Sequence, residues 1–349
     1  MRAIQWNEDQ KTLALIDQRK LPAELTMVVC EDEYQTADAI RTMVTRGAPI
    51  IGVTAAFGMV MAAYRASAAD VAGLQADLQT ASDVLNASRP TAVNLPWALA
   101  RMMRVANEPA ESKDALCQRL EAEAVAMAEE DVAINKRMAE YGAALIEDGD
   151  TIIHHCNTGA LATVDWGTAL GVIRMAHEQG KQIQVLVDET RPRMQGARLT
   201  AWELQQYGVP FHIIADGAAG HFLHTGQVQR VLFGADRVAA NGDVANKIGS
   251  YMLALAAHAN QVPVYSVFPF STVDLALANG GLIPIEEREE SEVLDIQLMG
   301  QQATPAGALA RNPAFDVTPQ HLLSGWITEY GIISPPFDRN FEKARKSAT

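Results

Sequence analysis

The stretch HHCNTGALAT, residues 154–163, places one cysteine between two histidines and a turn of small residues. Cys156 is a candidate nucleophile, because the run after it is helix-like and a nearby helix N-terminus would lower the pKa of its thiol. A cysteine–histidine pair also needs a third group to orient the histidine, and a single sequence does not reveal one. Cysteine is just as common as a buried structural residue. Taken alone, the residue leaves both interpretations open.

The histidines do not form a recognisable metal site. His154, His155 and Cys156 are direct neighbours, and alternate residues of a strand face opposite sides of the sheet, so the three do not easily converge on one ion. His221 and His224 could share a helix face, but a zinc site needs more ligands at a recognisable spacing. We therefore expect no metal ion, and interpret these histidines as hydrogen-bonded or surface residues.

Asp236 is a second residue with possible chemistry. It closes an apolar run in FGADRVAANGD, with Gly234 and Ala235 immediately before it. A carboxyl group in small, apolar surroundings can have its pKa raised and then carry a proton at neutral pH. An aspartate at a strand end is also a common cap of the following loop, so Asp236 by itself does not decide between the two.

Two loops have residues suited to an anion. TRGAPIIG, residues 45–52, offers an arginine followed by backbone N–H groups that can approach an anion closely. NKIG, residues 246–249, places Lys247 just before the helix-like run SYMLALAAHA. Neither GxGxxG nor GxxxxGK[ST] occurs, so dinucleotide and P-loop interpretations are weak and we expect no cofactor. Each loop is also compatible with ordinary turn chemistry.

The candidate residues of the second half follow predicted strands. β-branched runs occur in residues 150–156, 181–189, 210–216, 229–236 and 262–270. Helix-like segments separate them at spacings of about 30 residues, which indicates right-handed βαβ units and a parallel sheet. Cys156, Asp188, Asp216 and Asp236 each come at or just past the end of a run. In an open α/β sheet, ligands bind at that carboxyl edge.

The first half has a helical pattern. PTAVNLPWALARMMRVAN, residues 90–107, predicts a helix entered through a proline-marked turn. From Ser112 onward, apolar residues recur at three- and four-residue steps and predict one long amphipathic helix that ends near Gly149. We place a domain boundary at about residue 147. Residues 1–147 then form a smaller, mostly helical domain that ends in a bridging helix, and residues 148–349 form the catalytic α/β domain.

Composition limits the class of protein. The 349 residues suit two domains, and 48% hydrophobic with 20% charged residues is ordinary for globular proteins. A formal net charge of −14 argues against a nucleic-acid surface. Three scattered cysteines and an N-terminus without an apolar secretory region predict a cytoplasmic protein. The uncharged run of residues 47–64 begins Gly-Ala-Pro and is rich in alanine, so we expect a buried helix and no membrane association.

Together these motifs resemble the methylthioribose-1-phosphate isomerase family, which also contains the regulatory subunits of the translation-initiation nucleotide-exchange factor. The matching stretches are LIDQRKLP, TRGAPIIG, SRPTAVNLPWAL, HCNTGALAT, DETRPRMQGARLTAWEL, GADRVAANGDVANKIGSY and NPAFDVTP. They cover most of the chain, and the two longest are too specific to match by chance. The departures are changes of shape beside the motifs, at His154, Ile50, Met194 and Ser250.

The resemblance implies a homodimer whose C-terminal domain is Rossmann-like and whose N-terminal domain is mostly helical. It implies an aldose–ketose isomerase that converts 5-methylthioribose 1-phosphate to 5-methylthioribulose 1-phosphate in methionine salvage. Carried over by motif, Cys156 stabilises the transition state and Asp236 donates a proton. The implied substrate-binding residues are Arg46, Gly47, Ala48, Arg89, Gln195, Asn246 and Lys247.

Other functions stay open. An isomerase of 5-deoxyribose 1-phosphate needs only an apolar pocket for the 5-substituent, as the methylthio sugar does. An isomerase of ribose 1,5-bisphosphate needs additional cations, which an acidic chain makes less favourable. A non-catalytic regulatory subunit that binds sugar phosphates or nucleotides is a further alternative, and the presence of Cys156 and Asp236 in their full motifs argues against it.

Overall fold

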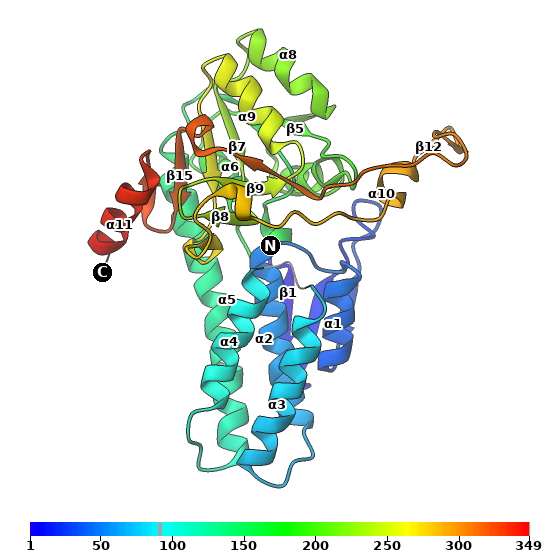
Figure 1. The fold of residues 1–349 in the computed structure, drawn as a ribbon, viewed down its shortest axis with the longest axis vertical. Helices are drawn as coiled ribbons and strands as arrows, with labels where there is room; N and C mark the ends of the chain where they lie inside the picture. The colour runs from blue at the N-terminus through cyan, green and yellow to red at the C-terminus, as the bar shows by residue number, and fades with distance from the viewer. Residues whose placement is uncertain (90–92, 349) are drawn as a thin grey trace. The chain divides into compact units, whose positions relative to one another are not determined.

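The structure is a computed structural model that describes residues 1–89 and 93–348 (Figure 1). The chain divides into two compact units. The first comprises Met1–Ala139 with Thr158–Gly171, and the second comprises Glu140–Asn157 with Val172–Thr349. This division differs from the sequence-based one, which cuts the chain once, at about residue 147. The predicted domain boundary at about residue 147 stays a prediction.

The return of residues 158–171 to the first unit has a physical cause in hydrogen bonds distant in sequence. Gln18 donates its side-chain amide to the carbonyl of Leu161 at 2.6 Å, and the backbone N–H of Ala3 donates to Val164 at 3.0 Å. The backbone N–H of Val164 donates to the carboxylate of Asp131 at 2.8 Å. Local sequence pattern does not report such pairings, so a single boundary is the natural prediction.

The first unit is mostly helical, as predicted. An antiparallel sheet of order β1-β2-β3 precedes the helices. The elements are β1 (Ile4–Asn7), β2 (Thr12–Ile16), β3 (Met27–Cys30), α1 (Glu33–Arg41), α2 (Ala48–Arg65), α3 (Val71–Asn86), α4 (Asn94–Ala106) and most of α5 (Lys113–Ala143). The helix predicted from residue 90 is α4, and Pro90, expected to mark the turn into it, lies outside the described residues.

Helix α2 is the core of the first unit. By length and composition alone it could cross a membrane, but 78% of its apolar window is buried. It packs against α1, α3 and α4. Its Gly52 has the backbone carbonyl of Asn94 only 2.8 Å from where a Cβ would lie, so α4 approaches closely because no side chain intervenes. The prediction of a buried helix for residues 47–64 is confirmed.

Helix α5 ends earlier than its sequence pattern suggests. Its last residue is Ala143, whereas the apolar periodicity extends towards Gly149. The ammonium group of Lys181 donates to the carbonyls of Ala143 and Ile146, at 2.7 Å each. A cation on the last carbonyls of a helix satisfies groups that have no intrahelical partner and complements the helix dipole. Lys181 lies in a different segment of the chain, so the apolar periodicity of α5 gives no sign of where the helix ends.

The second unit is built on a mixed, mostly parallel sheet of order β16-β15-β10-β7-β4-β5-β6. Its strands are β4 (Thr151–His154), β5 (Gln184–Asp188), β6 (Phe211–Ile214), β7 (Arg230–Phe233), β10 (Val264–Val267), β15 (Gly325–Thr328) and β16 (Gly331–Ile333). Every neighbouring pair is parallel except β15 with β16. The predicted parallel sheet is confirmed, and each of the five predicted strand runs contains one strand.

Helices pack on both faces of this sheet. Trp326 of β15 belongs to the same hydrophobic cluster as Leu253 of α9. The next residue, Ile327, comes within 3.2 Å of the site a Cβ on Gly142 would occupy, and Val172 of α6 within 2.4 Å. Adjacent residues of a strand point to opposite faces, so α9 covers one face while α6 and the end of α5 cover the other. The unit is an α/β fold with a covered parallel sheet.

Shorter elements complete the second unit. The helices are α6 (Ala169–Glu178, which begins in the first unit), α7 (Ala201–Tyr207), α8 (Ala219–His224), α9 (Ser250–Ala259), α10 (Ser291–Leu294) and α11 (Phe337–Ala348). A second sheet has the order β11-β8-β9-β14, with β11 (Val273–Asp274), β8 (Arg237–Ala239), β9 (Val244–Lys247) and β14 (Phe315–Thr318). A hairpin of β12 (Gln297–Leu298) and β13 (Gln301–Gln302) projects from the unit in Figure 1.

We expect the free energy of unfolding to depend on pH through Asp131, in α5. Burial raises the pKa of Asp131 to about 7, although the N–H of Val164 and the side chain of Asn135 oppose the rise. The folded pKa lies above the unfolded value of about 4, so the folded state holds a proton that the unfolded state has lost. This contribution to the free energy of unfolding therefore falls as pH rises from about 4 to about 7.

We expect the variant Asp131→Asn, which cannot ionise, to lack this decline. Urea unfolding at pH 4.5 and pH 7.5 measures it, and the wild type should lose on the order of 2 kcal/mol relative to the variant. Asp114→Asn, at an exposed position of the same helix, is the matched control. Equal pH slopes for wild type and Asp131→Asn would show that the carboxyl is ionised normally in the folded protein.

Candidate active site

The polar residues predicted at strand ends gather along one edge of the large sheet. Strand β4 ends at His154, just before Cys156, and β7 ends at Phe233, shortly before Asp236. These two strands are parallel neighbours, with His154 opposite Leu232. Adjacent strands are about 4.8 Å apart, so Cys156 and Asp236 follow neighbouring strands at the same edge. Asp188 ends β5, and Asp216 comes shortly after β6, in agreement with the prediction.

Cys156 has an unusual backbone conformation. Its φ angle is 68°, in the left-handed region that a residue with a Cβ seldom adopts, and 8% of its surface is exposed. Such strain concentrates at functional sites. The expected α-helix after it is absent from the described residues at that position, where only a 3-10 turn, Ala160–Ala162, occurs. The predicted helix directly after Cys156 is therefore wrong.

His155 is a buried hydrogen-bonded histidine beside the cysteine. Its Nδ1 lies 2.8 Å from Oδ2 of Asp188, and its Nε2 lies 3.0 Å from the carbonyl oxygen of Ile248. A carbonyl only accepts, so Nε2 carries a hydrogen. Burial alone would lower the pKa of His155, but the hydrogen bond and charge of Asp188, the charge of Asp216 and the Ile248 carbonyl outweigh it and raise that pKa.

Asp216 joins the same network and gives it the appearance of a metal site. One ligand atom each of His155, Asp188 and Asp216 lies within 4.8 Å of the others. However, His155 and Asp188 contact each other directly, and both Asp216 oxygens accept backbone N–H groups, from Thr190 at 2.8 Å and Arg191 at 2.7 Å. These hydrogen bonds hold both oxygens of Asp216 without a cation, whereas Oδ1 of Asp188 has no hydrogen-bond partner within the described residues. We interpret the group as a hydrogen-bond network, and the expectation of no metal ion stays a prediction.

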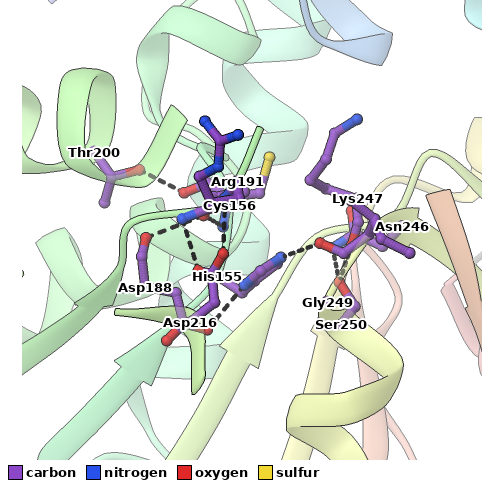
Figure 2. A network of polar contacts seen from close by, with 12 residues as sticks. His155, Cys156, Asp188, Arg191, Thr200, Asp216, Asn246, Lys247, Gly249 and Ser250 are labelled. Atoms are coloured by element: carbon purple, nitrogen blue, oxygen red, sulfur yellow. Dashed lines mark hydrogen bonds and ion pairs between the residues drawn. The ribbon is translucent and has the colours of Figure 1, made fainter. Parts of the chain in front are cut away.

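Asn246 and Lys247 end strand β9 and are 3% and 5% exposed. Asn246 donates to the hydroxyl of Ser250 at 2.8 Å, and Lys247 donates to the carbonyl of Ala314 at 2.6 Å. In Figure 2 the side-chain ends of Lys247, Cys156 and Arg191 extend to the same side of the view. Their hydrogen bonds hold this buried amide and ammonium group at fixed positions.

The start of α9 does not offer the anion site that NKIG suggests. The carboxylate of Asp316, in β14, accepts the backbone N–H of Gly249 at 2.7 Å and that of Tyr251 at 3.1 Å. An aspartate therefore already occupies the helix N-terminus where an anion was expected to bind. The expectation for the helix start is wrong, because the capping residue is more than sixty positions away and local sequence gives no sign of it.

Gln195 lies directly before an unusual helical turn. It is 6% exposed, and its side-chain oxygen has no hydrogen-bond partner within the part of the chain that the structure describes. A π-helix, Gly196–Thr200, follows it and continues into α7. Single π-turns occur frequently at functional sites. A buried amide oxygen without a protein donor is costly, and a substrate hydroxyl group would satisfy it.

The remaining predicted residues lie in the first unit. Gly47 precedes α2 with a φ of 126°, and Ala48 is the first residue of the helix. A Cβ on Gly47 would lie 2.5 Å from the carbonyl oxygen of Ala162, so only glycine fits there. Arg46 comes immediately before, whereas Arg89 follows α3 at the border of the described residues. Glycine has no side chain, so Gly47 makes no capping hydrogen bond to the backbone N–H groups at the start of α2.

We expect the addition of one methyl group at Gly196 to destabilise the fold strongly. A Cβ at this position would lie 1.7 Å from the carbonyl oxygen of Asp188 and 2.9 Å from the hydroxyl of Thr190. Backbone cannot move aside cheaply, so Gly196→Ala should lower the free energy of unfolding by about 2 kcal/mol or more and displace the loop beside Cys156. Thermal unfolding checks this. Gly217→Ala, where a Cβ meets open space, is the control and should be close to neutral.

The second unit is an α/β fold whose covered parallel sheet has polar side chains along its carboxyl edge, the place where such sheets bind ligands. Residues 44–335 match the family described as the Initiation factor 2 subunit family. A relative from Synechococcus sp., named methylthioribose-1-phosphate isomerase, is 50% identical over 98% of this chain and 97% of its own length.

Solved structures give the same picture. The 5-methylthioribose 1-phosphate isomerase from Pyrococcus horikoshii is 40% identical, with a TM-score of 0.90 over 99% of this chain and 96% of its own. The structure described as translation initiation factor eIF-2B, subunit delta, from A. fulgidus is 42% identical, with a TM-score of 0.88 over 99% of both chains. The chain belongs to the Initiation factor 2 subunit family, and its full-length relatives make it an isomerase of that family.

Proposed function

We propose that the protein converts 5-methylthioribose 1-phosphate to 5-methylthioribulose 1-phosphate, a step of methionine salvage. Numbered along the chain, the strands of the large sheet run 3-2-1-4-5-6-7, with β4 as strand 1, β7 as strand 4 and the antiparallel β16 as strand 7. The order of the first six strands is typical of Rossmann-like folds, and the order reverses between strands 1 and 4. Ligands bind at that switch point in such sheets, and Cys156 and Asp236 follow these two strands.

The position of Cys156 and Asp236 after two neighbouring strands of the sheet carries the proposal. In a ribose 1-phosphate the anomeric oxygen is esterified, so the ring opens only if the bond between C1 and the ring oxygen breaks. An acid beside the ring oxygen assists that step, and a protonated Asp236 supplies it. Asp236 is half-buried and follows an apolar strand and two small residues.

Hydrogen then moves from C2 to C1 of the opened sugar. In one route Cys156 removes the C2 proton as a thiolate and an enediol forms. In the other, hydride shifts within a pocket that excludes water, and Cys156 stabilises the transition state. Both routes need the thiol at a fixed position beside the carbon chain, and the strained backbone of Cys156 is consistent with that need.

The substrate phosphate needs a cluster of donors in a protein of net charge −14. We assign it to Arg46, the backbone N–H groups of Gly47 and Ala48, and Arg89. Gly47 gives the start of α2 no side-chain cap, and this supports the assignment because a helix N-terminus favours a phosphate. Arginine adds bidentate hydrogen bonds to phosphate oxygens. We assign Lys247, Asn246 and the unsatisfied oxygen of Gln195 to substrate oxygens.

One assay separates the candidate functions. Purified protein is incubated with 5-methylthioribose 1-phosphate, 5-deoxyribose 1-phosphate and ribose 1,5-bisphosphate, and the ketose product is followed by NMR. We expect the methylthio sugar to have the highest kcat/KM. Turnover of the deoxy sugar at an equal or higher value would change the assigned substrate. Binding without turnover on all three sugars would support the regulatory subunit, a function that a fold also found in a translation initiation factor allows.

Arg89→Ala tests the phosphate assignment. Loss of a bidentate charged contact should raise KM roughly tenfold to a hundredfold while kcat changes much less, because the contact forms equally in the ground state and the transition state. Steady-state kinetics with the methylthio sugar measure both constants. Arg104→Ala, at an exposed arginine of α4, is the control. An unchanged KM in Arg89→Ala would remove this residue from the binding site.

The further parts of the proposal come from the family resemblance and the sequence. We propose a homodimer in the cytoplasm, with no metal and no cofactor. Light scattering coupled to gel filtration gives the mass in solution. Activity should be unchanged by EDTA, and a loss that a divalent ion restores would reopen a metal role for the group around His155.

A further inference from the structure

The residues that hold Cys156 are absent from the mechanism proposed above. Both backbone polar atoms of Cys156 are hydrogen-bonded to threonine hydroxyls. Its N–H donates to Oγ1 of Thr190 at 2.9 Å, and its carbonyl accepts from Oγ1 of Thr200 at 2.7 Å. Both threonines are fully buried. The two hydroxyls thus fix the peptide groups on either side of a residue whose φ lies in the left-handed region.

Each hydroxyl is part of a directed chain of hydrogen bonds. Thr190 accepts from Cys156 and passes its own hydrogen to the carbonyl of Asp188 at 3.0 Å. Thr200 accepts from the side-chain amide of Asn157 at 3.1 Å and gives its hydrogen to the carbonyl of Cys156. A threonine hydroxyl has one hydrogen and two lone pairs, so neither chain reverses without leaving a buried group unsatisfied.

Further contacts fix the positions of the two threonines. Thr190 has a φ of 62°, and its N–H donates to Asp216. Thr200 is the last residue of the π-helix. A shift of one residue along a helix rotates a side chain by about 100°, so the extra residue of the π-turn changes the direction of the Thr200 side chain. Asn157 also donates to the fully buried Glu203 at 2.8 Å.

We propose that Thr190 and Thr200 are positioning residues that hold Cys156 in its left-handed conformation and so aim its thiol past the strand ends. The inference rests on the proposed function in assigning chemistry to Cys156. In Figure 2 the sulfur lies on the same side of the view as the cationic ends of Arg191 and Lys247. A thiol held in one direction is aligned with a reacting partner, whereas a thiol free to turn spends part of its time misaligned.

The test uses the isosteric variants Thr190→Val and Thr200→Val, which remove a hydroxyl and keep the shape. We expect kcat to fall roughly tenfold to a hundredfold in each, with KM changed less than about threefold, because misplacement of a reacting group affects the chemical step. Alkylation of Cys156 by iodoacetamide, followed by mass spectrometry, should slow about threefold or more at pH 7, because the thiol is no longer held in one direction. Thr190→Ser and Thr200→Ser restore the hydroxyl and should recover both properties.

The control is Thr328→Val in β15. Thr328 is also fully buried, and its hydroxyl contacts the backbone of Gly331 and Tyr330, so it reports the general cost of losing a buried hydroxyl. Its alkylation rate and kcat should stay within about twofold of wild type. Wild-type kcat and alkylation in both folded valine variants would overturn the proposal, as would serine variants as impaired as the valine ones. Alkylation is measured without substrate, so it tests the positioning role even if no sugar is turned over.

Discussion

We expect the replacement of Asp236 by asparagine to abolish turnover and to leave folding and substrate binding nearly unchanged. The two side chains are almost the same size, and the change removes only the acidic hydrogen that ring opening needs. Loss of a general acid lowers rates by roughly 10²-fold to 10⁴-fold. We therefore expect kcat for the methylthio sugar to fall by at least that factor, while the dissociation constant from calorimetry and the melting temperature change little.

A pH profile makes this prediction sharper. If Asp236 acts as an acid, kcat/KM of the wild type falls as pH rises through the pKa of this carboxyl. The control is Asp274→Asn, which alters another aspartate of the small sheet, one whose carboxylate is 3.9 Å from the guanidinium of Arg237. It should retain activity within about threefold, because an exposed or half-exposed ion pair contributes little. Full activity in Asp236→Asn would remove that residue from the chemistry.

The second large effect is expected for Cys156→Ser. A hydroxyl is about the size of a thiol but far less acidic, so it neither forms the anion at neutral pH nor offers a polarizable group to the transition state. The expected loss in kcat is again roughly 10²-fold to 10⁴-fold, with KM nearly constant. Because the side chain is small and the backbone contacts to Thr190 and Thr200 are kept, the melting temperature should not change.

The other two cysteines supply matched controls. Burial raises the pKa of the Cys30 thiol to about 11, and burial also raises that of Cys117. Both therefore stay protonated and unreactive at neutral pH, so a single alkylation event should inactivate the enzyme and map to Cys156. Cys30→Ala and Cys117→Ala should retain activity. Inactivation that follows modification of either of them, or survival of activity in Cys156→Ser, would contradict the role of Cys156.

The sequence predicts the strands of the second unit well because each is a short β-branched run bordered by turn residues. The parallel arrangement follows from alternation with helices, and the placement of Asp188, Asp216 and Asp236 follows from strand ends. Helix α2 is predicted from its uncharged, alanine-rich composition. These properties are local, so a window of residues contains the information that decides them.

The predictions that fail depend on groups far away in sequence. The end of α5 depends on Lys181, and the start of α9 depends on Asp316. The pair formed by His155 and Asp188 also joins two strands, and no spacing within either strand reveals it. The positioning hydroxyls of Thr190 and Thr200 were missed for the same reason, although the polar run that contains them was recognised as a motif.

By itself, the sequence determined the class of chemistry, since the residue types in its motifs match those of one isomerase family, and it determined the order of strands and helices along the chain. Only the tertiary structure decided which strands are neighbours, and therefore that Cys156 and Asp236 follow adjacent strands at the predicted edge. It also decided the left-handed backbone of Cys156 and the partners that hold it. The reason is physical: element type depends on nearby residues, whereas pairing, capping and backbone strain depend on contacts between segments that only folding brings together.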